Sequence, residues 1–230
     1  MNSSILLNLV LAHVIGDFYL QTDRACRQKE EQKLKSWFLY VHAIMIGLLS
    51  WVLVPVAEFA LYALVIAVSH LMIDVVKVYM RSGLWSFVID QLAHLGVLVV
   101  VVCIFQTSDE FLFQSLCNFH SFSIPLLTLA ILLCMKPTNL FIKLLLTQYQ
   151  VGASESCRDL KNAGALIGNL ERLLTIIFVM IGQYEAIGFI VAAKSILRFK
   201  DTDTAKTEYV LAGTFLSFGI AILCGLMVLL

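Results

Sequence analysis

Apolar residues gather in eight runs along the chain, separated by short polar connections, and these runs predict its helices. A helix that crosses a membrane needs about 20 mostly apolar residues, within a range of about 17–25. The fifth and seventh runs are short, so either could be re-entrant, and Thr138–Tyr149 is expected as an interfacial helix or as part of a broken span. The eight predicted spans are Ser3–Leu20, Trp37–Val54, Val56–Tyr79, Leu84–Phe105, Ser121–Met135, Gly164–Gly182, Tyr184–Leu197 and Tyr209–Leu230.

The overall composition agrees with this pattern. Of 230 residues, 60% are hydrophobic and only 14% are charged, and the mean hydropathy is +0.90. A soluble domain has about 25% charged and about 45–50% apolar residues, so the apolar excess is too large for a soluble core. We therefore expect an all-α, polytopic transmembrane helical bundle with two four-span halves, residues 1–106 and 107–230. We expect membrane lipid and no nucleic acid as a partner; the net charge is zero and by itself indicates no class of partner.

Basic residues predict how the chain is oriented. Lys and Arg occur in Arg24–Lys35 and in every second connection after it, whereas the intervening connections contain neither. Cytoplasmic loops of membrane proteins carry the excess of Lys and Arg, so the N-terminus is predicted outside. Arg24–Lys35 itself is interpreted as a solvated, helical connection of mixed charge. The three connections without Lys or Arg are Pro55–Glu58, Gln106–His120 and Gln183–Glu185.

Seven ionisable side chains lie inside the first four apolar runs, and six of them form pairs four residues apart. A spacing of four places both members of a pair on one helix face. With a rise of about 1.5 Å per residue, all seven fall within about 4–15 Å of the cytoplasmic helix ends. Ionisable groups inside a membrane are costly and indicate a functional site. The seven are His13, Asp17, His42, His70, Asp74, Asp90 and His94.

Imidazoles and carboxylates predict a divalent transition metal, with zinc first and manganese or iron as alternatives. The four histidines are the predicted ligands. Asp17, Asp74 and Asp90 are the catalytic candidates, as ligands, as bridges or as bases. Two ions about 3.5–4 Å apart would use the whole set. Alternatively, one ion is bound and an aspartate orients a ligating histidine.

A second group of charged residues lies in the sixth and seventh runs. These side chains either reach the headgroup region and pair locally, or they bind a lipid phosphate or carboxylate of the substrate near the metal. The predicted substrate-binding residues are Glu171, Arg172, Lys194 and Arg198.

Several motifs together resemble a bacterial membrane family, domain of unknown function 3307. The resemblance covers nearly the whole chain and implies a multi-pass protein of the bacterial inner membrane, without implying a function. The H-x-x-x-D pairs are also similar, by spacing alone, to those of membrane-bound metal-dependent hydrolases. The motifs are L-A-H-V-I-G-D-F-Y-L-Q-T-D (Leu11–Asp23), S-H-L-M-I-D (Ser69–Asp74), D-Q-L-A-H (Asp90–His94), L-E-R-L-L (Leu170–Leu174) and A-I-G-F-I-V-A-A-K-S-I-L-R-F-K (Ala186–Lys200).

The function expected from the residues is metal-dependent hydrolysis of a lipid or headgroup-linked substrate at the cytoplasmic interface. One alternative is a transporter or channel that uses the same cluster for a metal ion or protons. Another is a structural or signalling membrane protein whose metal joins four helices. Transporter sites lie near the membrane midplane, and structural sites are closed by four ligands. A site with seven candidates in one half of the membrane favours the enzyme.

Overall fold

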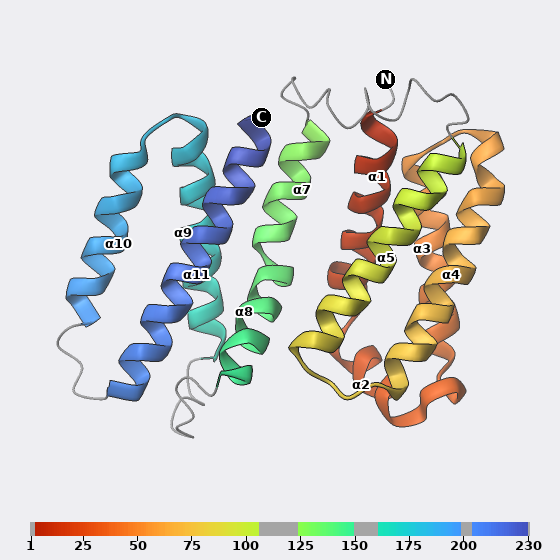
Figure 1. The fold of residues 1–230 in the computed structure, drawn as a ribbon, viewed down its shortest axis with the longest axis horizontal. Helices are drawn as coiled ribbons and strands as arrows, with labels where there is room; N and C mark the ends of the chain where they lie inside the picture. Colours follow the sequence, from red (N-terminus) through yellow and green to blue (C-terminus); the bar gives the residue numbers. More distant parts are fainter. Residues whose placement is uncertain (1–2, 106–123, 150–160, 199–203, 230) are drawn as a thin grey trace. The chain divides into compact units, whose positions relative to one another are not determined.

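A computed structural model describes residues 3–105, 124–149, 161–198 and 204–229 of the chain. All regular elements of this part are helices, which confirms the all-α expectation (Figure 1). The chain divides into two compact units, Met1–Ser121 (unit 1) and Phe122–Leu230 (unit 2).

Unit 1 contains four long helical regions and the segment that joins the first two. The helix α1 passes directly into a π-helical segment, η1, and the chain then bends by 86° before the next helix. The hydroxyl of Thr22 accepts a hydrogen bond from the Ala25 amide at 3.3 Å, which caps that helix at its start. The elements are α1 (Ser3–Val14), η1 (Ile15–Leu20), α2 (Asp23–Gln32), η2 (Lys33–Lys35), α3 (Trp37–Leu53), η3 (Ala57–Phe59), α4 (Ala60–Tyr79) and α5 (Leu84–Phe105).

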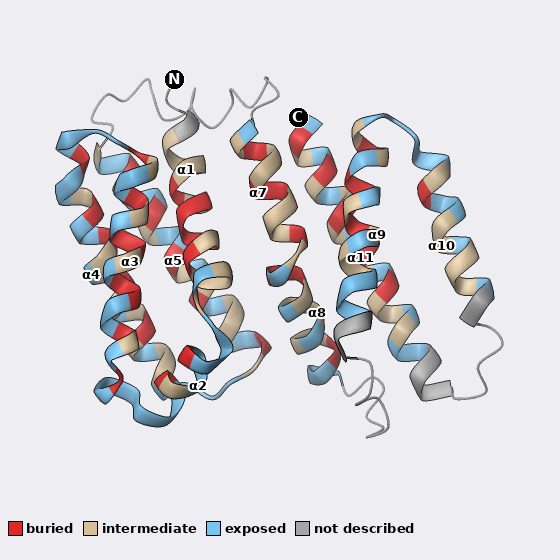
Figure 2. Cartoon of the chain, turned by 180° about the vertical axis from the view of Figure 1, so that it is seen from behind, coloured by how far each residue is buried: buried red, intermediate tan, exposed pale blue. Residues whose placement is uncertain are grey.

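Each of the helices α3, α4 and α5 buries one stripe of residues and exposes apolar side chains on its other faces (Figure 2). On α4 the buried stripe is Ala63, Ile66, His70 and Asp74, which recurs at helical spacing. The stripe therefore changes along the helix from apolar to ionisable. The apolar halves of these stripes form one core together with three residues outside them, Leu9, Val54 and Phe59. The residues that the stripes contribute are Ile46, Ala63, Ile66, Leu98, Val101 and Val102.

The helices α3 and α4 approach closely at a glycine. A Cβ atom on Gly47 would lie 2.8 Å from the Ala67 Cβ and 3.0 Å from the Ala63 carbonyl oxygen. Only a residue without a side chain allows this approach, which brings the His42 and His70 helices together.

The described residues of unit 2 form a broken helix and three further helices. The break between its first two helices lies at Met135, and Pro137 occupies the first turn after it. Together these two helices form a 25-residue apolar segment, Ile124–Gln148, which favours a broken span over an interfacial helix for Thr138–Tyr149. The elements are α7 (Ile124–Cys134), α8 (Lys136–Gln148), α9 (Lys161–Met180), α10 (Tyr184–Arg198) and α11 (Thr204–Leu229).

The described helices include four that are long and apolar enough to cross a membrane, or five if the bent first pair counts as one span. A membrane protein is therefore indicated, but the predicted count of eight spans is not confirmed. The apolar helix α3 has only 17 residues and α10 only 15. At about 1.5 Å per residue, α10 is shorter than the hydrocarbon core of about 30 Å. The four helices that are long and apolar enough to cross a membrane are Ala57–Tyr79, Leu84–Phe105, Ile124–Gln148 and Glu208–Leu229.

Candidate metal centre

The ionisable ends of the buried stripes meet inside unit 1, at the end of the bundle that faces α2 (Figure 1). His13 comes from α1, Asp17 from η1, His42 from α3 and His70 from α4, whereas Asp90 and His94 come from α5. Four helical regions thus contribute to one polar cluster. The sequence indicates such a cluster, because these residues lie at similar distances from the cytoplasmic ends of the predicted spans.

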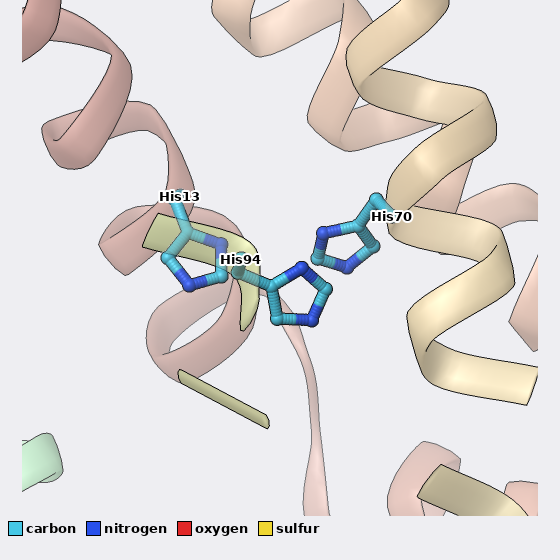
Figure 3. A group of neighbouring side chains, drawn as sticks. All are labelled: His13, His70 and His94. Carbon is cyan, nitrogen blue, oxygen red and sulfur yellow. The ribbon is translucent and has the colours of Figure 1, made fainter. Parts of the chain in front are cut away.

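The histidine rings form a contiguous group. The ring centroids of His70 and His94 are 4.1 Å apart, and those of His13 and His94 are 4.9 Å apart. The ring of His94 lies between the other two (Figure 3). On the far side of His70, the His42 centroid is 5.0 Å away. All four rings are at least nine-tenths buried.

Asp17 places one carboxylate oxygen among three of these rings. Its Oδ1 lies 3.1 Å from Nε2 of His42, 3.5 Å from Nε2 of His70 and 3.8 Å from Nδ1 of His13. The contact with His42 meets the geometry of a hydrogen bond. Asp17 is therefore the carboxylate that links the histidines of α1, α3 and α4.

Several buried atoms of the cluster have no hydrogen-bond partner among the described residues. They are Nε2 of His70, Nε2 of His94 and Oδ1 of Asp90. The last two atoms are 3.4 Å apart but are not aligned as donor and acceptor. A buried polar group without a partner costs free energy. These atoms point to a ligand of the cluster.

Six of the seven predicted residues form sets that could hold a metal ion. Within each set, one ligand atom per residue lies within 4.8 Å of the others. The seventh, Asp74, is outside these sets, although its Oδ2 is 4.0 Å from Nε2 of His70. The sets are His13, His70 and His94; Asp17, His42 and His70; and Asp17, Asp90 and His94.

Two lysines and a glutamine, which the sequence reasoning missed, complete the cluster. Nζ of Lys29 donates to Oδ2 of Asp74 at 2.7 Å, and Nζ of Lys77 donates to Oδ2 of Asp90 at 2.6 Å. The side-chain amide of Gln91 lies 3.3 Å from His13 and 3.1 Å from Asp90. Each of these side chains contacts at least one predicted residue of the cluster.

The interpretation of Arg24–Lys35 as a solvated connection is wrong for Lys29, which is only 6% exposed. Ala25 and Lys29 are the buried residues of α2, and they lie one turn apart. The sequence feature that could have indicated the burial of Lys29 is Ala25, which lies four residues earlier in a helix of mostly polar residues.

The charged candidates of unit 2 pair within that unit. Nζ of Lys194 donates to Oε2 of Glu171 at 2.6 Å. Arg172 is buried and donates to Asn139, Asn169, Ser217 and the Cys134 carbonyl. Arg198 ends α10, and its side chain lies outside the part that the structure describes. A role of these residues in substrate binding stays a prediction.

Comparison with known proteins identifies one family. The family model described as "Protein of unknown function (DUF3307)" matches residues 5–123, more than half of the chain and nearly all of unit 1. No curated protein and no solved structure matches the chain. The matched region includes every residue of the cluster described above.

Proposed function

This chain belongs to the DUF3307 family, and we propose that it is a membrane-embedded, metal-dependent hydrolase whose metal is held by the histidines and aspartates of unit 1. The observation that carries the proposal is a group of buried atoms without hydrogen-bond partners in the described part of the chain: Nε2 of His70, Nε2 of His94 and Oδ1 of Asp90. In a cluster that only joined helices through hydrogen bonds, these atoms would have partners. Divalent cations would satisfy these atoms: one set contains both His70 and His94, and another contains both Asp90 and His94.

The ligand types select the ion. Imidazole and carboxylate suit zinc, iron and manganese, and zinc binds both at about 2.0–2.2 Å. Zinc is therefore our first choice. Each set offers three ligand residues, one fewer than the four that close a structural zinc site, so a position would remain for water or substrate.

The chemistry that suits such a site is hydrolysis. A bound ion lowers the pKa of its water towards about 7. In the proposed reaction, water adds to the acyl or phosphoryl centre, and the ester bond to the leaving oxygen breaks. The proton that the water gives up passes to that oxygen, and Asp90, a member of one metal set, would help to hold the ion that activates the water.

The substrate that we propose is a lipid or a molecule linked to a lipid headgroup. The cluster lies between helices that are apolar enough to span a membrane, so a substrate carried by the membrane can reach it sideways. We further propose that the cluster faces the cytoplasm of a bacterial inner membrane, from the alternation of basic and uncharged connections.

Metal analysis of the purified protein tests the metal-binding part. We expect at least one equivalent of transition metal per chain in the wild type and a loss of at least half of it in His94→Ala. His120→Ala is the matched control, because His120 is the chain's fifth histidine and belongs to the predicted connection 106–120. A wild-type protein that takes up no metal after dialysis against zinc, manganese or iron would refute the proposal.

A chromogenic ester assay tests the hydrolase part. We expect turnover that chelation abolishes and that added metal restores, and no turnover in Asp90→Asn. A tightly bound ion with four protein ligands and no exchangeable water, measured by X-ray absorption, would instead support a structural metal. Uptake of zinc into proteoliposomes without hydrolysis would support the transporter.

A further inference from the structure

Two of the possible metal sets share a single residue. The set Asp17, His42 and His70 and the set Asp17, Asp90 and His94 have only Asp17 in common. A carboxylate has two oxygens and can bind two ions at once, whereas a neutral imidazole has one free nitrogen. The shared residue is thus of the type that can bridge two ions.

His13 is a member of neither of these two sets but shares a third set with one histidine of each. It forms the third set with His70 and His94, one from each of the other groups. Its Nδ1 is 3.8 Å from Oδ1 of Asp17. His13 could therefore complete the coordination of either ion.

The number of ligands also favours a pair of ions. An open catalytic site uses three protein ligands for one ion. The six residues in the sets would supply three ligands to each of two ions, with Asp17 counted twice and His13 as the additional one. Ligand atoms on one ion lie at most about 4.2 Å apart. The ligand atoms of each set lie within 4.8 Å of one another, so the sets would contract when an ion binds.

The backbone fixes the shared carboxylate at this place. Asp17 lies in η1, and π-helical turns inside α-helices are frequent at functional sites. A Cβ atom on the preceding Gly16 would lie 2.0 Å from Cδ1 of Ile46. The glycine therefore lets η1 pack directly onto α3, which brings Asp17 within 3.1 Å of His42.

The charges of the cluster decide which substrate group it attracts. The carboxylates of Asp17, Asp74 and Asp90 with the ammonium groups of Lys29 and Lys77 leave one negative charge. If the imidazoles are neutral, one divalent ion would bring the net charge of the cluster to plus one, and two ions would bring it to plus three. An excess of three positive charges in a buried site requires anionic ligands.

We propose that the centre holds two divalent ions bridged by the Asp17 carboxylate and that the substrate group it binds is a phosphate; this rests on the metal binding proposed above. A phosphate brings up to two negative charges and several oxygens, and two ions clamp the attacking and leaving oxygens of a phosphoryl group. The Lys77 side chain is 41% exposed, so its ammonium group is the accessible cation at the edge of the centre.

Loading with manganese tests the pair of ions. We expect two equivalents of Mn²⁺ per chain and an electron paramagnetic resonance spectrum of an exchange-coupled pair. Asp17→Asn should reduce the content to one equivalent and remove the coupling. Asp23→Asn, a change at an exposed aspartate of α2, is the matched control and should retain both.

The possible outcomes separate this inference from the proposed function. No bound metal would refute both. One uncoupled ion per chain would refute the pair and leave the metal-dependent hydrolase standing. Two ions without coupling would refute the bridge. If Asp17→Asn fails to fold, His42→Ala, which removes a ligand of the first set alone, should still hold one ion, and two retained ions in that variant would refute the assignment.

A phosphate titration tests the substrate group. Inorganic phosphate should alter the spectrum of the manganese-loaded protein, and Lys77→Met should weaken this effect about tenfold. Nanodiscs with phosphatidic acid and nanodiscs of phosphatidylcholine alone distinguish the source. If phosphatidic acid alters the spectrum without added phosphate, the group belongs to a lipid; if only inorganic phosphate does, it is free. No change with either probe would refute the phosphate inference.

Discussion

The ammonium group of Lys29 lies 2.7 Å from Oδ2 of Asp74, although 45 positions separate the two residues in the chain. Both side chains are more than nine-tenths buried. Lys29 belongs to α2 and Asp74 to α4, so this ion pair attaches α2 to the polar end of the bundle. The helix α2 therefore packs against the polar cluster.

We predict that either half of this ion pair is needed for stability. Lys29→Met should lower the free energy of unfolding by about 3–5 kcal/mol, because it leaves the Asp74 charge buried without a partner. Asp74→Asn should also destabilise the protein, because it leaves the Lys29 charge buried without a partner. The loss of unfolding free energy in the double variant should be smaller than the sum of the losses in the two single variants. Thermal unfolding in detergent measures this. Glu30→Gln, at the exposed neighbour of Lys29, is the control; a loss of the same size there would contradict the assignment.

The glycine contact between α3 and α4 gives a second prediction. Gly47→Ala should cost about 1–3 kcal/mol, because a new Cβ would meet the Ala63 backbone, which cannot rotate away. Gly96→Ala in α5 has no atom within 4 Å of its new Cβ and should stabilise by about 0.5–1 kcal/mol. Unfolding of the two variants in the same detergent provides the comparison. Equal changes in stability would show that helix propensity alone determines the effect of both substitutions.

The buried guanidinium of unit 2 gives a third prediction. Arg172 donates to Ser217 at 2.7 Å, to Asn139 at 2.5 Å, to Asn169 at 2.6 Å and to the Cys134 carbonyl at the end of α7. Arg172→Met should destabilise unit 2 strongly, since each buried group left without a partner costs about 1–3 kcal/mol.

Two variants control for the loss of charge at this position. Arg172→Lys keeps the charge but lacks the planar fork, and it should also be less stable than the wild type. Lys143→Met removes an exposed charge from α8 and should change the melting temperature little. A wild-type melting temperature in both Arg172 variants would show that the network contributes nothing.

Labelling of single cysteines tests the proposed orientation. Ser36, at the end of the basic connection, is fully buried and unsuitable for labelling. Cys26, an exposed native cysteine of α2, is the better probe. In a variant with Cys26 alone, an impermeant maleimide should react only after the inner membrane is opened. Glu58→Cys, exposed in the opposite connection, should react in intact spheroplasts. The reverse pattern would place the cluster on the outer side.

The sequence was sufficient to predict the helices and the ionisable stripes. The helices α3 and α5 begin at Trp37 and Leu84, the first residues of the predicted spans. Apolar runs and a spacing of four depend only on local helix geometry, so one sequence reveals them. The six residues of the metal sets all belong to the predicted seven.

The partners of the aspartates could not be predicted in the same way. Lys29 lies in a polar segment whose other members are mostly exposed, and only the 86° bend before α2 turns it towards Asp74. Lys77 pairs with Asp90 across the connection between two helices. Such contacts depend on tertiary packing, which neither hydropathy nor spacing encodes. The π-helical geometry of η1 was missed for the same reason.

The π-helical segment makes the cluster sensitive to chain length. A π-turn holds one residue more than an α-turn, so the loss of any one residue of Ile15–Leu20 other than Asp17 would convert the segment to ordinary α-helix. That loss would rotate the helix before it by about 100° relative to the helix after it. His13 would turn away from His94 while every ligand remained in the sequence. A deletion of one codon in this segment is thus the smallest inherited change that would keep the helices but disrupt the metal-binding cluster.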